Sequence, residues 1–434
     1  MGGPLGRQTK TAQRRDGALV MDFEDSPAEA EFRSVARRWM DANAPKEYAT
    51  ALRQAGFGEL NLDGVDVLTA AKTWQRRKAA AGWACPHWPR EYGGSGLTPI
   101  QQVIWQQEEG FYGRLATPFI VGHGMCGPTL MSHASEEDRR RYLPPLAAGE
   151  EIWCQLFSEP GAGSDLAGIS TRASAVADGW VINGQKVWTS FAQLSDFGLL
   201  LARTDPSVPK HRGLTMFYVD MHAPGVEVRP IKQANGQSGF NEVFFSDVRI
   251  KDQQRLGAVG AGWHVALTTL MNERLAIGSG MTTGFEAIFT WCCALERSGA
   301  KVFDDRAVRS RLATWAARSS GLKYTASRAI TALSRGTTPG PENSIGKLVA
   351  GSTMQEIAEF ALGLAGPLGV VSDPLGAVDG GRFQAMLLRA PATRLEGGTD
   401  EILRNIISER VLGLPPDIRV DKDIPFNRIP TRSA

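Results

Sequence analysis

Residues 153–165 read WCQLFSEPGAGSD, and residues 183–190 read NGQKVWTS. The first five residues form a short apolar run that predicts a strand, and a loop of small residues follows it. Proline, two glycines and Ser164 in this loop suit a tight turn whose amides face a bound phosphate or ring. Asp178-Gly179 then predicts a two-residue hairpin turn before further strand structure. Glycine and proline spacing of this kind is common in ordinary turns, so the spacing alone does not identify a function.

The bulk composition limits the class of protein. At 434 residues the chain has room for about three domains. It is 42% hydrophobic and 22% charged, and its 48 basic and 46 acidic residues give a formal net charge of +2. Proteins that bind nucleic acid usually carry a clustered basic excess, so nucleic acid is not expected as a partner. We expect no membrane span, because no apolar run reaches the roughly 18 residues that a bilayer requires.

Cysteine and histidine usage argues against disulfides and metal sites. The chain has five cysteines, an odd number, without metal-ligand spacing, which favours a reduced intracellular compartment. We expect a cytoplasmic protein, with the mitochondrial matrix as the alternative. The six histidines are dispersed and form no HxH or HxxxH arrangement, so no metal site is expected.

The chain divides by its hydrophobic pattern. Helical spacing predicts helices over 27–42, 65–81, 100–112, 136–146, 263–295, 305–335, 343–365 and 400–412, and short apolar or β-branched runs predict strands between 151 and about 260. The expected parts are a disordered basic leader over 1–20, a helical domain over 21–150, a β domain over 151–262, a helical bundle over 263–415 and an extended tail over 416–434. An organelle transit peptide is the alternative for the leader, which lacks the apolar segment of a secretory signal.

The two quoted stretches resemble the flavin-binding middle domain of the acyl-CoA dehydrogenases, and the resemblance covers roughly residues 21–415. It implies an α+β multidomain fold with an N-terminal all-α domain, a middle β-barrel-like domain and a C-terminal four-helix bundle. It also implies FAD as cofactor and an acyl-CoA thioester as substrate, dehydrogenated to the trans-2-enoyl-CoA, as in fatty acid β-oxidation. Such a reaction needs a base for the α-proton and a redox cofactor for the hydride, because no side chain can accept a hydride.

Glu273 and Glu396 are the two candidates for the base. The segment 271–277 matches the place from which isovaleryl-CoA and long-chain acyl-CoA dehydrogenases supply their base, also a Glu followed by Arg. Many other members place a Glu directly before a Gly-Thr pair, where this chain has Gly397, and Glu396 lies one residue earlier. The residues one helical turn from Glu273 are uncharged, which predicts a carboxyl with a raised pKa. We therefore favour Glu273, with Glu396 as the alternative.

The resemblance assigns the remaining site residues. The backbone N–H of Gly397 is expected to polarise the thioester carbonyl, as in an oxyanion hole. Flavin contacts are expected from Phe157, Ser158, Gly163, Ser164, Trp188, Ser190, Thr399 and Glu401, with a weaker match at Gly366 for a contact to the flavin of a neighbouring subunit. Ser164 and Arg274 are also expected to contact the acyl-CoA. Independently of the resemblance, Thr399 followed by Asp400 and Glu401 is typical of a helix N-terminus.

Partners and alternatives follow from the same resemblance. An electron-transferring flavoprotein is the expected electron acceptor, and a homo-oligomer, dimer or tetramer, is the expected assembly. The family's Arg-x-x-Phe-Gly string is missing around 298–305, so a hetero-oligomer stays open. A flavin-dependent oxidase or monooxygenase on the same fold is one alternative function. A subunit of a hetero-oligomeric acyl-CoA dehydrogenase that lacks its own catalysis is the other, and the intact 158–165 loop and Glu273 argue against it.

Overall fold

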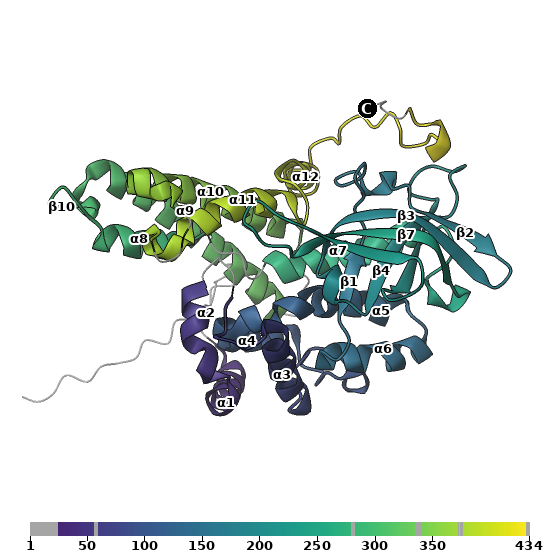
Figure 1. Cartoon of the computed structure of the whole chain (residues 1–434), viewed down its shortest axis with the longest axis horizontal. Coiled ribbons are helices and arrows are strands. Elements are labelled where there is room, and N and C mark those ends of the chain that lie inside the picture. The colour runs from purple at the N-terminus through teal and green to yellow at the C-terminus, as the bar shows by residue number, and fades with distance from the viewer. Residues whose placement is uncertain are drawn as a thin grey trace, which may run out of the picture.

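The computed structural model describes residues 25–55, 60–278, 283–334, 340–371, 373 and 376–430, without the side chains of 274–278 and 333–334. The predicted leader, 1–20, therefore lies outside the described residues. Helices, a β-sheet and a second set of helices follow one another along the chain, which confirms the predicted fold class. In Figure 1 the sheet lies on one side, helices α8 to α11 extend to the other, and the N-terminal helices lie beneath.

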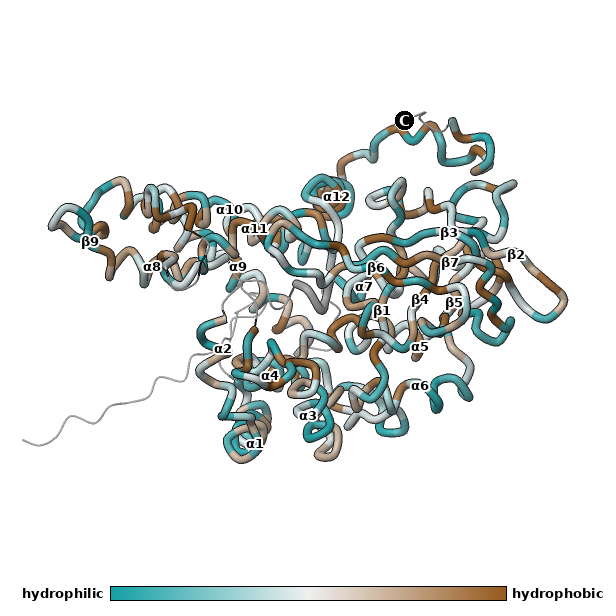
Figure 2. The backbone as a smooth tube through the Cα atoms, viewed as in Figure 1, coloured by the Kyte–Doolittle hydropathy of each residue, from teal (hydrophilic) through white to brown (hydrophobic). Residues whose placement is uncertain are grey.

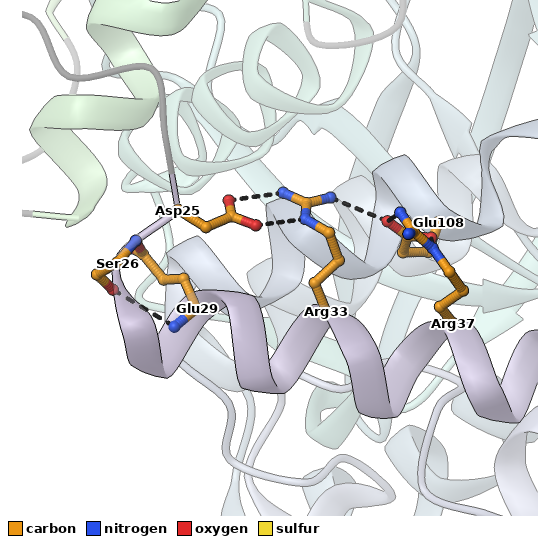
Figure 3. Close-up of polar contacts among 6 residues, drawn as sticks. All are labelled: Asp25, Ser26, Glu29, Arg33, Arg37 and Glu108. Atoms are coloured by element: carbon orange, nitrogen blue, oxygen red, sulfur yellow. Dashed lines mark hydrogen bonds and ion pairs between the residues drawn. The ribbon is translucent and has the colours of Figure 1, made fainter. Parts of the chain in front are cut away.

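The N-terminal helices begin where the sequence places caps. They are α1 (Pro27–Asn43), α2 (Ala49–Ala55), α3 (Val67–Ala80), α4 (Pro99–Glu109), α5 (Gly127–His133) and α6 (Glu136–Ala148). Ser26 and Glu29 form a capping box at the start of α1, in which each side chain accepts from the other's backbone N–H. Arg33 then joins α1 to α4, because its guanidinium donates to Asp25 at 2.5 Å and to Glu108 at 3.0 Å (Figure 3).

The middle part is one large sheet. Its strands are β1 (Trp153–Leu156), β2 (Arg172–Val176), β3 (Gly179–Ser190), β4 (Phe197–Arg203), β5 (Leu214–Asp220), β6 (Val226–Ile231), β7 (Phe240–Ile250) and β8 (Arg255–Leu256). The path of paired strands runs β6-β7-β3-β2-β4-β5-β8, and β1 pairs with β4 in parallel. β4 is buried on both faces: Leu199 and Leu201 join the core shared with the helices, and Leu200 and Ala202 join the core on the opposite face. The outer helix α6 instead begins with a hydrophilic stretch, visible in Figure 2.

The C-terminal part is helical. Its helices are α7 (Gly262–Gly278), α8 (Phe285–Ala294), α9 (Arg306–Ser334), α10 (Ser344–Ala365), α11 (Arg382–Leu395) and α12 (Asp400–Ile406), and a short hairpin of β9 (Glu296–Arg297) and β10 (Ala300–Lys301) follows α8. α10 contacts α7, α8, α9, α11 and α12, so it is the central helix of this part.

Several predicted elements have different limits in the structure. The single helix predicted over 263–295 is α7 and α8, and Gly284, with a φ of 78°, caps α8. The hairpin turn lies one residue earlier than predicted, because Gly179 already pairs with Val176. α2, α5 and α11 were not predicted; α2 and α5 have only seven residues each, and α11 contains Pro391, which hides its helical pattern.

The tail predicted over 416–434 pairs near its end with the loop between β4 and β5. The N–H of Phe426 donates to the carbonyl of Val208 at 2.9 Å, and the N–H of Asn427 donates to Pro206 at 3.0 Å. Figure 1 shows this segment running from α12 to the side of the molecule that carries the sheet. We call residues 421–430 the C-terminal strap.

Candidate functional site

Glu273 lies where α7 passes the end of β1. Its Oε2 accepts a hydrogen bond of 3.4 Å from Nε2 of Gln155, a half-buried side chain on β1. Gln155 lies only two residues before Phe157, so this contact places Glu273 next to the start of the 157–170 loop. The parallel pairing of β1 with the buried strand β4 holds Gln155 in register.

Phe157, Ser158 and Trp188 lie close to one another where the loop after β1 meets β3. The N–H of Val187 donates to the carbonyl of Ser158 at 2.9 Å, which brings Trp188 next to the loop. Phe157 is buried, whereas Trp188 is 58% exposed, and its ring faces that of Phe240 edge-on with 6.1 Å between the ring centres. Trp188 also has a φ of 60°, at a place where the pairing of β3 with β7 is irregular. A large aromatic residue held in this strained conformation and left exposed indicates a surface that binds a flat ring.

Glu159 and Lys186 hold the loop, and neither was predicted from the sequence. The carboxylate of Glu159 accepts from the N–H groups of Ser170 and Thr171 at 2.6 and 2.9 Å and from Nζ of Lys186 at 2.8 Å. Lys186 also donates to the carbonyl of Phe157 at 2.9 Å. Burial lowers the pKa of Lys186 to about 8, against the opposing attraction of Glu159. The signal available in the sequence was a Glu inside a loop of small residues and a Lys inside an otherwise apolar strand.

Gly163 and Ser164 are exposed at the tip of this loop. The next residue, Asp165, accepts from Nζ of Lys210 at 2.8 and 2.9 Å. The same Nζ donates to Asp421 of the C-terminal strap at 2.5 Å. Lys210 therefore connects the loop to the strap.

The turn before α12 carries the second group of predicted residues. Gly397 and Gly398 have φ values of 61° and 96°, a conformation that glycine adopts without strain. The hydroxyl of Thr399 accepts from the N–H of Ile402 at 3.3 Å, which confirms it as the N-cap of α12. Glu401 is exposed in the first turn, and hydrogen bonds from its own N–H and from Thr399 lower its pKa.

Lys347 of α10 contacts this turn. Its Nζ donates to the carbonyl of Gly398. Burial lowers the pKa of Lys347, while the nearby carboxylates of Glu396, Asp400 and Glu273 act in the opposite direction. The raised pKa expected for Glu273 stays a prediction, which was based on the uncharged neighbours along its own helix, whereas Lys347, Glu396 and Asp400 lie on other elements.

Glu396 differs from Glu273 in its contacts. It accepts from Nη2 of Arg389 at 2.5 Å, about two turns back along α11, and this ion pair is partly exposed.

The structure does not place two of the predicted site residues, Gly366 and Arg274, near the others. Lys347 lies near the start of α10 and Gly366 follows its end, about 28 Å farther along the helix axis at 1.5 Å per residue. Gly366 is thus remote from the turn before α12 within one chain, as a contact to a neighbouring subunit requires. The side chain of Arg274 lies outside the described residues.

The described residues fit a flavin. An exposed indole on Trp188 supplies a face for a flat ring, and Ser158 and Ser190 are half-buried polar side chains beside it. The hydroxyl of Thr189, the residue between Trp188 and Ser190 in the chain, is buried without a hydrogen-bond partner. A polar ring edge meets such a hydroxyl better than a hydrocarbon does. In the described part of the chain, no group of three or more His, Cys, Asp or Glu could hold a metal ion, and no helix could span a membrane.

Comparison with known proteins agrees with this geometry along the whole chain. Three family descriptions match in order: Acyl-CoA dehydrogenase, N-terminal domain, over residues 26–150; middle domain, over 154–248; and C-terminal domain, over 260–412. Acyl-CoA dehydrogenase IpdE1 of Mycobacterium tuberculosis is 37% identical over 398 residues, which cover 90% of this chain and 98% of that protein. Acyl-CoA dehydrogenase FadE34 of the same organism is 38% identical over 84% of this chain, which spans about half (52%) of that longer protein.

Solved structures show the same fold. A structure described as the Tcur3481-Tcur3483 steroid ACAD superposes with a TM-score of 0.75 at 27% identity, covering 92% of this chain and all (100%) of that one. The ChsE4-ChsE5 complex from Mycobacterium tuberculosis gives a TM-score of 0.74 at 28% identity, with the same coverage of 92% and 100%.

Proposed function

Because this chain belongs to the acyl-CoA dehydrogenase family, we propose that it converts an acyl-CoA thioester to the trans-2-enoyl-CoA with Glu273 as the base. It is an oxidoreductase, and FAD is its cofactor. The observation that carries the choice of base is the hydrogen bond between Gln155 and Glu273, which ties the carboxylate of α7 to the strand that leads into Phe157 and Ser158.

The side chains and backbone groups of the chain have separate roles in this reaction. Oε of Glu273 accepts the α-proton, and Gln155 orients that carboxylate without adding a charge. The N–H of Gly397 donates to the thioester carbonyl, where negative charge develops as the proton leaves. Phe157, Ser158, Trp188 and Ser190 hold and orient the ring of the cofactor. When bound, FAD supplies the acceptor for the hydride from the β-carbon.

We propose a bulky, ring-bearing acyl group as the substrate class. One support is that a solved relative is described as a steroid ACAD. The other is the position of the base on α7, which the resemblance connects with branched, long or bulky acyl chains. We also propose an electron-transferring flavoprotein as the electron acceptor, and a hetero-oligomer as the assembly, since two relatives are described as pairs of different chains.

A thioester screen tests the function. The FAD-loaded protein is mixed without oxygen with linear, branched and steroid side-chain acyl-CoA thioesters, and flavin absorbance is followed. We expect fast bleaching by ring-bearing thioesters and slow reoxidation when air is admitted. Bleaching by none of them would contradict the proposed reaction, and rapid turnover with oxygen would favour an oxidase.

A further inference from the structure

Asn241 is a buried amide on β7 that packing alone does not explain. It is 0% exposed and pairs with Thr189 of β3 in the sheet. Asparagine is depleted in strands, and a buried polar group costs free energy unless it is hydrogen-bonded. Its Oδ1 is buried without a partner among the described residues, so part of that cost is not offset. A β-branched or aromatic residue would suit this place in the sheet better, so the amide nitrogen of Asn241 has a use beyond packing.

The amide nitrogen of Asn241 holds the end of β3. Nδ2 donates to the carbonyl of Thr189 at 3.0 Å and also to Oε1 of Gln193. Because a backbone carbonyl only accepts, the nitrogen rather than the oxygen of this amide must face Thr189. Gln193 lies in the short turn Ala192–Leu194 after β3, and its own Nε2 donates to the carbonyl of Ser238 at 3.3 Å. Asn241 therefore joins the last residues of β3 to the turn that follows them.

The segment held in this way has a strained backbone. Trp188 has a φ of 60° and Phe191 a φ of 57°, both in the left-handed region that residues with side chains seldom adopt. The pairing of β3 with β7 is also irregular between Lys186 and Thr189. A strained backbone of this kind persists only where the surrounding contacts determine it. The carbonyl of Thr189 lies between the two strained residues in the chain, so the hydrogen bond from Asn241 is placed to fix both.

We propose that Asn241 is a positioning residue for the flavin: by fixing the carbonyl of Thr189, it orients the residues on either side of it. Those residues are Trp188 and Ser190, which hold the flavin ring in the proposed function. The carbonyl of Thr189 and the N–H of Ser190 belong to one rigid peptide plane, so a rotation of this plane would turn both side chains away from the ring. This proposal rests on the proposed function, since it uses the flavin contacts given to these two residues above.

The affinity for FAD measures this role without a thioester. The FAD-loaded protein is diluted, and the FAD that it releases gives the dissociation constant of each variant. Asn241→Leu keeps the size of the side chain and removes the amide. We expect it to raise the dissociation constant for FAD about tenfold, an effect of the size of one hydrogen bond. The visible absorbance of the FAD that stays bound should move toward that of free FAD, because its ring loses ordered contacts.

A double-mutant cycle separates positioning from a general loss of stability. Trp188→Ala and Ser190→Ala together remove the contacts through which Asn241 is proposed to act. In that background Asn241→Leu should raise the dissociation constant by less than about twofold, because no contact is left to orient. An equal rise in both backgrounds would overturn the proposal.

Asn183→Leu is the matched control. Asn183 is also an asparagine that joins β3 to β7, since its Nδ2 donates to Asp247 at 2.9 Å. It lies near the other end of β3, about 20 Å from Thr189 at 3.3 Å per residue. We expect this variant to melt at a lower temperature and to keep its FAD dissociation constant within about twofold of the unaltered protein. If Asn241→Leu behaves in the same way, Asn241 is only a structural tie and the proposal is wrong.

If Asn241→Leu does not fold, Gln193→Ala still decides the question. Gln193 is exposed, and its loss frees Nδ2 of Asn241 from one of its two acceptors. We expect a rise of about threefold in the FAD dissociation constant, which should vanish when Trp188 and Ser190 are truncated. No rise in the otherwise unaltered protein would contradict the proposal.

The same measurements keep this proposal apart from the proposed function. If truncating Trp188 and Ser190 leaves the affinity for FAD unchanged, the flavin contacts are wrong and the role of Asn241 fails with them. If the unaltered protein bleaches with no thioester, the proposed reaction fails, whereas the FAD affinities still decide the role of Asn241.

Discussion

At the scale of single residues, the two candidate bases differ in their partners. Glu273 is bonded to the neutral amide of Gln155, and Glu396 to the guanidinium of Arg389. We expect Glu273→Gln to slow flavin bleaching by about 10²- to 10⁴-fold, the usual contribution of a positioned base. Glu396→Gln should keep most of the rate, because it removes only one anchor of the turn. If flavin still bleaches in the Glu273→Gln variant but not in the Glu396→Gln variant, Glu396 is the base instead of Glu273.

Trp188 combines strain with exposure, and a substitution can separate them. Glycine at this position would remove the left-handed strain of about 1 kcal/mol, so the melting temperature of the FAD-free protein should stay level or rise. The same change removes the indole, so FAD should dissociate more readily. FAD content after gel filtration and calorimetry of the apoprotein measure the two effects. Retained FAD affinity would show that the indole does not contact the flavin.

At the scale of elements, the C-terminal strap is tied to the loop that carries Ser164. Lys210 bridges Asp165 and Asp421, and the buried guanidinium of Arg203 stacks on the ring of Phe426 at 3.5 Å. We expect Lys210→Met to lower the free energy of unfolding by roughly 1–3 kcal/mol, because it removes charge-assisted hydrogen bonds.

Denaturant unfolding and limited proteolysis of the 158–170 loop measure this contribution. Lys232→Met is the matched control, since Lys232 is an exposed lysine on the same sheet domain, and it should change stability by less than about 0.5 kcal/mol. If the Lys210→Met and Lys232→Met variants are equally stable, the contacts of the C-terminal strap do not stabilise the protein.

At the scale of the whole molecule, the segment between α12 and the strap exposes apolar side chains. Every residue over 411–420 is exposed, including Ile418 at 94% and Val420 at 83%. Contiguous exposed apolar side chains are typical of surfaces that another chain covers. We expect the purified chain to associate, and Ile418→Ser with Val420→Ser to shift it to smaller species in native mass spectrometry. If the unsubstituted chain is a monomer with a full complement of FAD, the expected association does not occur.

The sequence by itself was enough for the order of the domains and for the local features of the site. Helical and strand periodicities are local, so α1, α3, α9 and α10 were predicted within a few residues of their limits. The N-cap at Thr399 was predicted for the same reason, since a cap and the N–H it accepts from are three residues apart.

Only the tertiary structure decided what surrounds Glu273 and what holds the loops. Gln155 and Glu273 are 118 residues apart in the chain, and Lys210 and Asp421 are 211 apart. No periodicity connects residues at such separations, because their contact depends on how the helices and the sheet pack. For the same reason a helix sequence shows only the neighbours one turn from Glu273, whereas Lys347 lies on another helix.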